Sequence, residues 1–172
     1  EICRVLDVKW KEPIHVYVYE NDEKGRALTG RALDFADPGG RKVHQRWNSY
    51  ISHEMVHIIA HNSLQDAQTG ILGEGIAVWL DSRTPARHHG LAKELLEKGE
   101  LPAIADLLSD FRAQSNSYPA SGSFCGWFLK EHGLEVFKEI YPLVDPSARA
   151  KELVGKSFVE MEAEWHAEIK KY

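Results

Sequence analysis

Hydrophobic and polar positions follow a period of two in the first third of the chain. Segment 13–20, PIHVYVYE, alternates aliphatic residues with His and Tyr, which predicts a strand with one buried face. The residues before it, 2–10, have a short helical spacing. The polar ENDEKGRALTG segment, 20–30, predicts a loop. Three further features complete a small mixed sheet: possible strands at 31–36 and 41–47, and a tight DPGG turn at 37–40.

From Asn48 onward the apolar positions recur with the period of a helix, and Gly or Pro separates most segments. The predicted helices span roughly 48–61, 73–82, 87–98, 102–109, 120–131, 134–141, 147–154 and 157–170. No Pro- or Ser-rich linker separates the two halves. We therefore predict an α+β fold in a single domain, 1–172, with a sheet-rich part at 1–47 and a helical part at 48–172.

Composition and charge exclude several classes of protein. A chain of 172 residues with 43% hydrophobic and 27% charged residues has the composition of an ordinary globular domain. The net charge of −5 is spread over both signs without a basic stripe, so nucleic acid is not an expected partner. The apolar run Ile71–Leu80 is interrupted by Gly and Glu and is too short to span a bilayer, so no integral membrane segment is predicted.

The compartment and the oligomeric state are left open by the sequence. Cys3 and Cys125 are too few for a disulfide framework and belong to no metal-binding cysteine motif. The chain opens at Glu1 and not at Met, which we interpret as the loss of any targeting signal. A secreted, a periplasmic and a cytoplasmic location all remain open.

The segment NSYISHEMVHIIAHNSL, 48–64, contains the pattern H-E-x-x-H at His53, Glu54 and His57. On a helix, residues four apart lie on the same face, so the two imidazoles can reach one metal ion. Glu54 would lie beside that ion, where its carboxylate can accept a proton from a water molecule. The pattern arises in about one shuffled sequence in twenty of this composition, so it needs further support.

A catalytic zinc ion requires three protein ligands and one open position, and Glu74 is the candidate for the third ligand. It is the only acidic residue in segment 70–80 and follows His57 by seventeen residues. The alternative for Glu74 is a carboxylate that complements a helix dipole. His61 continues the spacing of four, but a fourth protein ligand would close the site, so we interpret it as structural. His88 and His89 are expected to be solvated.

The pattern H-E-x-x-H followed by GEGIAVWL resembles the gluzincin zinc peptidases, above all the compact peptidase-MA-like domains. These are relatives of the thermolysin-type and zinc aminopeptidase families. The resemblance implies a zincin-like fold, a Zn²⁺ ion held by His53, His57 and Glu74, and Glu54 as the general base. It covers about residues 12–141.

A second segment, YPASGSFCGWFLKEHG at 118–133, resembles the part of these domains that follows the third ligand. This resemblance implies that Tyr118 donates a hydrogen bond to the oxyanion; the alternative is a Tyr that packs its ring beside Pro119. Two features of the relatives are missing. The chain has no G-x-M-E-N strand for a free amino terminus, and Val78 replaces an acidic residue that holds a histidine in many thermolysin relatives.

These features together predict a zinc-dependent hydrolase of peptide bonds that acts on a peptide or protein substrate. Two alternatives remain: a catalytically silent metalloprotease-fold domain that serves as a binding or structural module, and a hydrolase of other amides with the same zinc chemistry.

Overall fold

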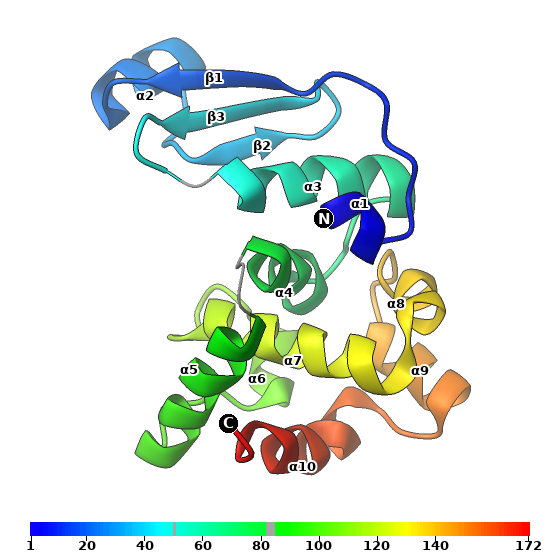
Figure 1. Cartoon of the computed structure of the whole chain (residues 1–172). Coiled ribbons are helices and arrows are strands. Elements are labelled where there is room, and N and C mark those ends of the chain that lie inside the picture. Colours follow the sequence, from blue (N-terminus) through cyan, green and yellow to red (C-terminus); the bar gives the residue numbers. More distant parts are fainter. Residues whose placement is uncertain (50, 82–84) are drawn as a thin grey trace. The chain divides into compact units, whose positions relative to one another are not determined.

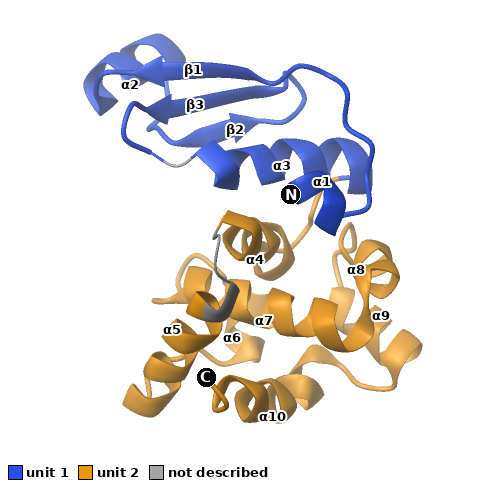
Figure 2. Cartoon of the chain, in the orientation of Figure 1, with its two compact units in different colours: residues 1–65 blue, residues 66–172 orange. Residues whose placement is uncertain are grey.

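The computed structural model covers the whole chain and describes residues 1–49, 51–81 and 85–172. Clustering of the backbone divides it into two compact units, Glu1–Gln65 and Asp66–Tyr172 (Figure 2). Tyr50 and Ser82, which belong to two of the predicted helices, lie outside the described residues. The first unit includes the helix with the H-E-x-x-H pattern, so it extends beyond the sheet-rich part predicted at 1–47. The prediction of a single domain stays a prediction.

The first unit contains a three-stranded mixed sheet and three helices (Figure 1). In chain order the elements are α1 (Ile2–Val5), β1 (His15–Tyr19), α2 (Asp22–Thr29), β2 (Phe35–Asp37), β3 (Lys42–Arg46) and α3 (Ile51–Leu64). The strand order is β1-β3-β2, with β1 parallel and β2 antiparallel to β3. The small mixed sheet and the DPGG turn are therefore confirmed, but the strand predicted at 31–36 is displaced, since β2 begins only at Phe35.

The prediction that β1 has one buried face is wrong. Residues 15–18 are exposed, and only Tyr19 is half-buried. The physical reason is the position of the strand: α3 packs against β2 and β3, where it covers Val43 completely. Since β1 is the outer strand, its aliphatic residues Val16 and Val18 retain exposed fractions of 38% and 57%. The alternation predicted the strand correctly, but not the exposure of its aliphatic face.

The segment predicted as a loop at 20–30 forms helix α2. Asn21 is its N-cap and accepts a hydrogen bond from the backbone N–H of Lys24, while acidic residues occupy the first turn. Gly30 ends the helix with φ = 72°, a left-handed conformation that glycine adopts without strain. The polar composition concealed this helix because its caps, and not an apolar face, mark its ends.

The second unit is entirely helical in its described part, and each predicted helix from 73 onward is confirmed (Figure 1). Its elements are α4 (Gly70–Asp81), α5 (Pro85–Lys98), α6 (Ile104–Ser109), α7 (Ser117–His132), α8 (Leu134–Ile140), α9 (Pro146–Val154) and α10 (Phe158–Ile169). The class is therefore α+β with a large helical share, as predicted. No helix of the described segments is long and apolar enough to cross a membrane.

Helix α7 forms the centre of the second unit and packs closely on α4. A Cβ atom on Gly75 would lie 2.6 Å from the Cys125 sulfur, and one on Gly122 would meet Val78. Glycines on both helices therefore allow the two backbones to approach. On the other side of α7, Phe124 contacts the rings of Phe158 and Trp165. Packed aromatic side chains thus form the core of this unit.

Candidate metal centre

Helix α3 is buried on most of its sides, as the apolar residues around the H-E-x-x-H pattern predict. Val56 and Ile58 are completely buried, Ile59 retains an exposed fraction of 5%, and Ala60 is completely buried. His53 and His57 are half-buried on the remaining face. The helix is therefore fixed by its apolar residues, while its two histidines remain accessible for a ligand.

The two histidines present their Nε2 atoms to each other. These atoms lie 3.2 Å apart, and the ring planes meet at 77° with centroids 4.9 Å apart. Two nitrogens bound to one tetrahedral zinc ion at 2.0–2.1 Å would be separated by about 3.3 Å. The spacing within α3 thus fits the coordination of a single metal ion without rearrangement of the helix.

Glu74 on α4 completes a group of three candidate ligands. One ligand atom each from His53, His57 and Glu74 lies within 4.8 Å of the others, and all three residues are half-buried. In the described segments no other three His, Cys, Asp or Glu residues form such a group. Two imidazoles and one carboxylate are a donor set of the kind that binds catalytic zinc and leaves a position open. The residues therefore fit the ion that their sequence pattern implies.

Glu54 follows the first histidine on α3 and is largely buried, with an exposed fraction of 9%. It is not part of the ligand group. Its position next to His53 suits the transfer of a proton to or from a group near the metal position.

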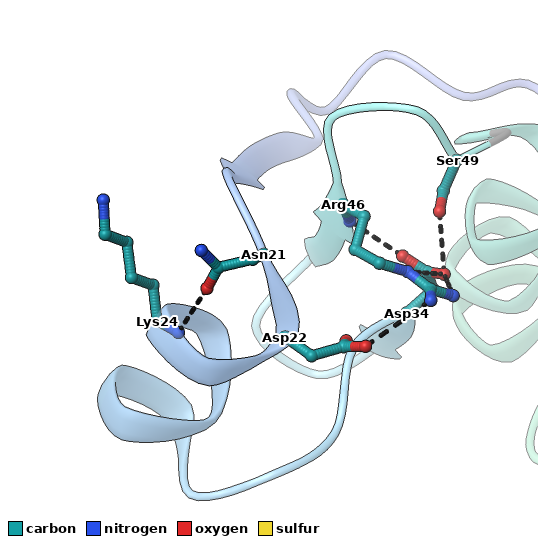
Figure 3. A network of polar contacts seen from close by, with 6 residues as sticks. All are labelled: Asn21, Asp22, Lys24, Asp34, Arg46 and Ser49. Carbon is teal, nitrogen blue, oxygen red and sulfur yellow. Dashed lines mark hydrogen bonds and ion pairs between the residues drawn. The ribbon is translucent and has the colours of Figure 1, made fainter.

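A cluster of hydrogen bonds around Asp34 fixes the turn that leads into α3 (Figure 3). Its carboxylate accepts hydrogen bonds from the backbone N–H of Arg46 at 2.8 Å, from the guanidinium of Arg46 at 2.6 and 3.1 Å, and from Ser49 at 2.8 Å. Arg46 also pairs with Asp22 at 3.5 Å. Asp34 thus ties the end of β3 to Ser49, which lies two positions before Ile51.

These contacts also change the acidity of Asp34. Partial burial by itself raises the pKa of the carboxyl, but the hydrogen bonds and the charge of Arg46, with the Ser49 hydroxyl, outweigh it and lower the pKa below the ordinary value. The group is thus held as a carboxylate. Sequence analysis missed Asp34, because a single acidic residue inside a short strand pattern gives no indication of a partner twelve positions later.

Tyr118 is the second residue of α7 and has an exposed fraction of 46%. Its ring meets that of Phe111 edge to face at 5.4 Å. It lines a cavity of about 630 Å³ together with Arg112, Gln114, Asn116, Ser117 and Pro119. An exposed phenol in a cavity wall is available to a substrate, which keeps both the oxyanion role and the packing role open as predictions.

His88 and His89 are buried, with exposed fractions of 8% and 2%, so the prediction that they are solvated is wrong. The physical reason is their helix: α5 packs against α7, and His89 meets the Ser123 hydroxyl of α7 at 2.9 Å through Nδ1. Burial lowers the pKa of His89 to about 4. This residue is therefore a neutral part of the core at pH 7.

Comparisons with models of known protein families, with curated proteins and with solved structures found no match for this chain. The site is therefore interpreted from its own residues and geometry.

Proposed function

We propose that this protein is a zinc-dependent hydrolase of peptide bonds with a zincin-like fold. The observation that supports the proposal most is the donor group itself: two imidazole nitrogens 3.2 Å apart on one helix turn, with the Glu74 carboxylate in the same group. Three such ligands leave one coordination position of a tetrahedral ion open. An open position is what distinguishes a catalytic zinc site from a structural one.

In this proposal His53, His57 and Glu74 hold the ion. When bound, zinc supplies a Lewis acid that polarises a carbonyl group and makes a water molecule more acidic. Both histidines act as ligands in the neutral form, with the Nε2 lone pair free and the proton on Nδ1. Glu74 must be ionised for the same purpose.

Glu54 is the proposed general base. Its carboxylate accepts a proton from the attacking water and afterwards delivers it to the leaving amine, so that one group acts in both halves of the reaction. The Tyr118 hydroxyl is the proposed donor to the oxyanion of the tetrahedral intermediate, and Phe111 holds its ring from the side.

An extended peptide is the substrate class that this arrangement favours. Strand β2 is an outer strand of the sheet and packs on α3, so its free edge offers backbone hydrogen-bonding groups near the metal-binding helix. A peptide can add to such an edge as a further strand. Cleavage of a peptide library measures which side chains the peptide must have.

The test combines metal analysis with cleavage of a broad peptide library, for the native protein and for Glu54→Gln. The amide of the variant has nearly the shape of the carboxylate but cannot accept the proton. We expect about one zinc ion per chain in both proteins, and a loss of cleavage of about 10²- to 10⁴-fold in the variant.

Two matched controls sharpen this test. His61→Ala changes a histidine of the same helix outside the ligand group and should leave zinc content unchanged, whereas His57→Ala should remove the metal. Absence of zinc from the native protein would contradict the metal site. Zinc without any cleavage would contradict the hydrolase and support the alternative of a silent binding module.

A further inference from the structure

Strand β1 is an outer strand, and among the described residues no backbone group pairs with its outward edge. In its parallel register with β3, the backbone N–H of His15 donates to Arg41, and the carbonyl of Tyr19 accepts from Trp47. Since bonds to one neighbour alternate along a strand, His15, Tyr17 and Tyr19 face β3. The N–H and C=O groups of Val16 and Val18 therefore point away from the sheet.

This edge lacks the features by which proteins usually prevent strand pairing. Residues 15–19, HVYVY, include no charged residue, no proline and no glycine. The exposed fractions of Val16, Tyr17 and Val18 are 38%, 44% and 57%. An apolar edge of this kind is a template for another strand.

On the face opposite to Val16 and Val18, Tyr17 belongs to a row of stacked rings. Tyr17 stacks on His44 with centroids 5.0 Å apart and an angle of 8°, and His44 stacks on Phe35 at 4.7 Å and 9°. The Arg31 guanidinium lies 4.3 Å from the Phe35 ring centre. The row runs across all three strands and stops at Tyr17, where the sheet stops.

We propose that β1 is a self-association edge, at which two copies of this chain pair antiparallel about a two-fold axis through Tyr17. In this register Val16 of each copy lies opposite Val18 of the other. Those are the residues whose backbone groups point outward, so four hydrogen bonds form between the copies. The two Tyr17 residues meet at the axis as a non-hydrogen-bonded pair.

A second copy fits this edge because the strand is complementary to itself. Valine faces valine on one side of the new sheet, and tyrosine faces tyrosine on the other, which joins the two rows of rings into one. This is the symmetry that an isologous dimer interface requires. Near the end of the strand Lys24 pairs with Glu20 and Arg46 pairs with Asp22 within each copy, so these carboxylates already have a counter-charge when the two strands approach.

The size of the contact predicts a weak dimer. Stable interfaces bury about 1,200–2,000 Å² in total, and two five-residue strands of about 17 Å fall short of that. We therefore expect a dissociation constant between about 1 µM and 1 mM. The six-stranded sheet forms at high protein concentration and separates on dilution.

Sedimentation equilibrium over a range of concentrations up to about 1 mM tests the proposal. Val18→Lys places a charge on the new interface and should weaken dimerisation at least about tenfold. Val144→Lys is the matched control, because Val144 is exposed to 80% and belongs to the second unit, outside the strand and the helix that follows it, and should have no effect. A purely monomeric native protein, or equal weakening by both variants, would overturn the proposal.

Cross-linking gives a second measurement that does not depend on the strength of the dimer. At the two-fold axis the two Cα atoms of residue 17 lie about 4.5 Å apart, within the range for a disulfide. In a Cys3→Ser background, Tyr17→Cys should form a covalent dimer under mild oxidation, since Cys125 is buried. Val144→Cys, an equally exposed position in the second unit, should not. Equal cross-linking of both variants would contradict the two-fold pairing.

Discussion

The two units of this protein differ in what holds them together. Almost all of the largest fully buried side chains belong to the second unit, where Phe124, Phe158 and Trp165 pack around α7. The first unit buries aliphatic residues under a small sheet and adds the hydrogen-bonded cluster at Asp34. The first unit thus combines apolar burial with a charged hydrogen-bonded cluster, while the helical unit relies mainly on apolar burial.

The two units should therefore respond differently to mutation and to pH. A packed aromatic core tolerates little change in any of its members, because a lost ring leaves a cavity. A cluster of charge-assisted hydrogen bonds instead responds to pH and to the removal of one partner. The four predictions below, in order of expected size, compare how the two units respond to loss of a core ring, to acid, to loss of a charged partner and to loss of a helix cap.

Trp165→Ala should have the largest effect on stability. The side chain is completely buried, contacts Phe124, and donates from Nε1 to the Ser123 hydroxyl at 3.1 Å. We expect a loss of about 3–5 kcal/mol in the free energy of unfolding of the second unit, from burial and from the cavity. Hydrogen exchange resolved to single segments measures this. Protection lost equally in β3 and α10 would contradict a unit-specific effect.

Moderate acid should weaken the second unit before the first. Burial lowers the pKa of four of its histidines, His88, His89, His132 and His166, and also that of His44 in the first unit. A neutral buried imidazole favours folding above its unfolded pKa of about 6.5, and this contribution decreases as the unfolded chain binds protons below that value.

For His89 the decrease should continue down to about pH 4, where the folded protein also binds the proton. The expected loss is about 1–3 kcal/mol in the second unit between pH 6.5 and 4. Urea denaturation at a series of pH values, followed by tryptophan fluorescence, gives the slope. His89→Gln should reduce that slope, and an unchanged slope would contradict the assignment to His89.

Asp34→Ala should destabilise the first unit by about 2 kcal/mol, because Arg46 and Ser49 lose a charged acceptor. The native pKa lies below the unfolded one, so the contribution is present above about pH 4 and disappears as the pH falls further. In the native protein this acid sensitivity should thus begin where that of His89 ends. Asp37→Ala, at the end of β2, is the comparison: Asp37 accepts a hydrogen bond from the Gly40 backbone, so a smaller loss is expected. An equal loss in both variants would argue against a special role of Asp34.

Removal of helix caps should have the smallest effect and should be similar in both units. Asn21 caps α2 and Ser157 caps α10, where a full capping box with Glu160 is present. Asn21→Ala and Ser157→Ala should each cost about 1 kcal/mol. Local hydrogen exchange in the first turn of each helix measures the change. A much larger loss at Asn21 would show that α2 supports the sheet beyond its own stability.

Much of the fold could be predicted from the sequence, because the evidence for it is local. Helical periodicity identified α3 to α10 within a few residues of their observed ends, and alternation identified β1 and β3. The segment at α2 was missed, since its two caps are weaker indications than an apolar face. The histidine pair could also be predicted, because a spacing of four on a helix sets the geometry of two side chains.

The sequence by itself determined most of the elements and the choice of His53, Glu54 and His57 as the candidate chemical centre. Only the tertiary structure decided what covers each element: that β1 has an open edge, that His88 and His89 are buried, and that Glu74 belongs to the ligand group. It also joined Asp34 to Arg46 and Ser49. The physical reason is the range of the forces involved. Backbone periodicity acts over a few residues, whereas burial and charge pairing depend on neighbours that are far apart along the chain.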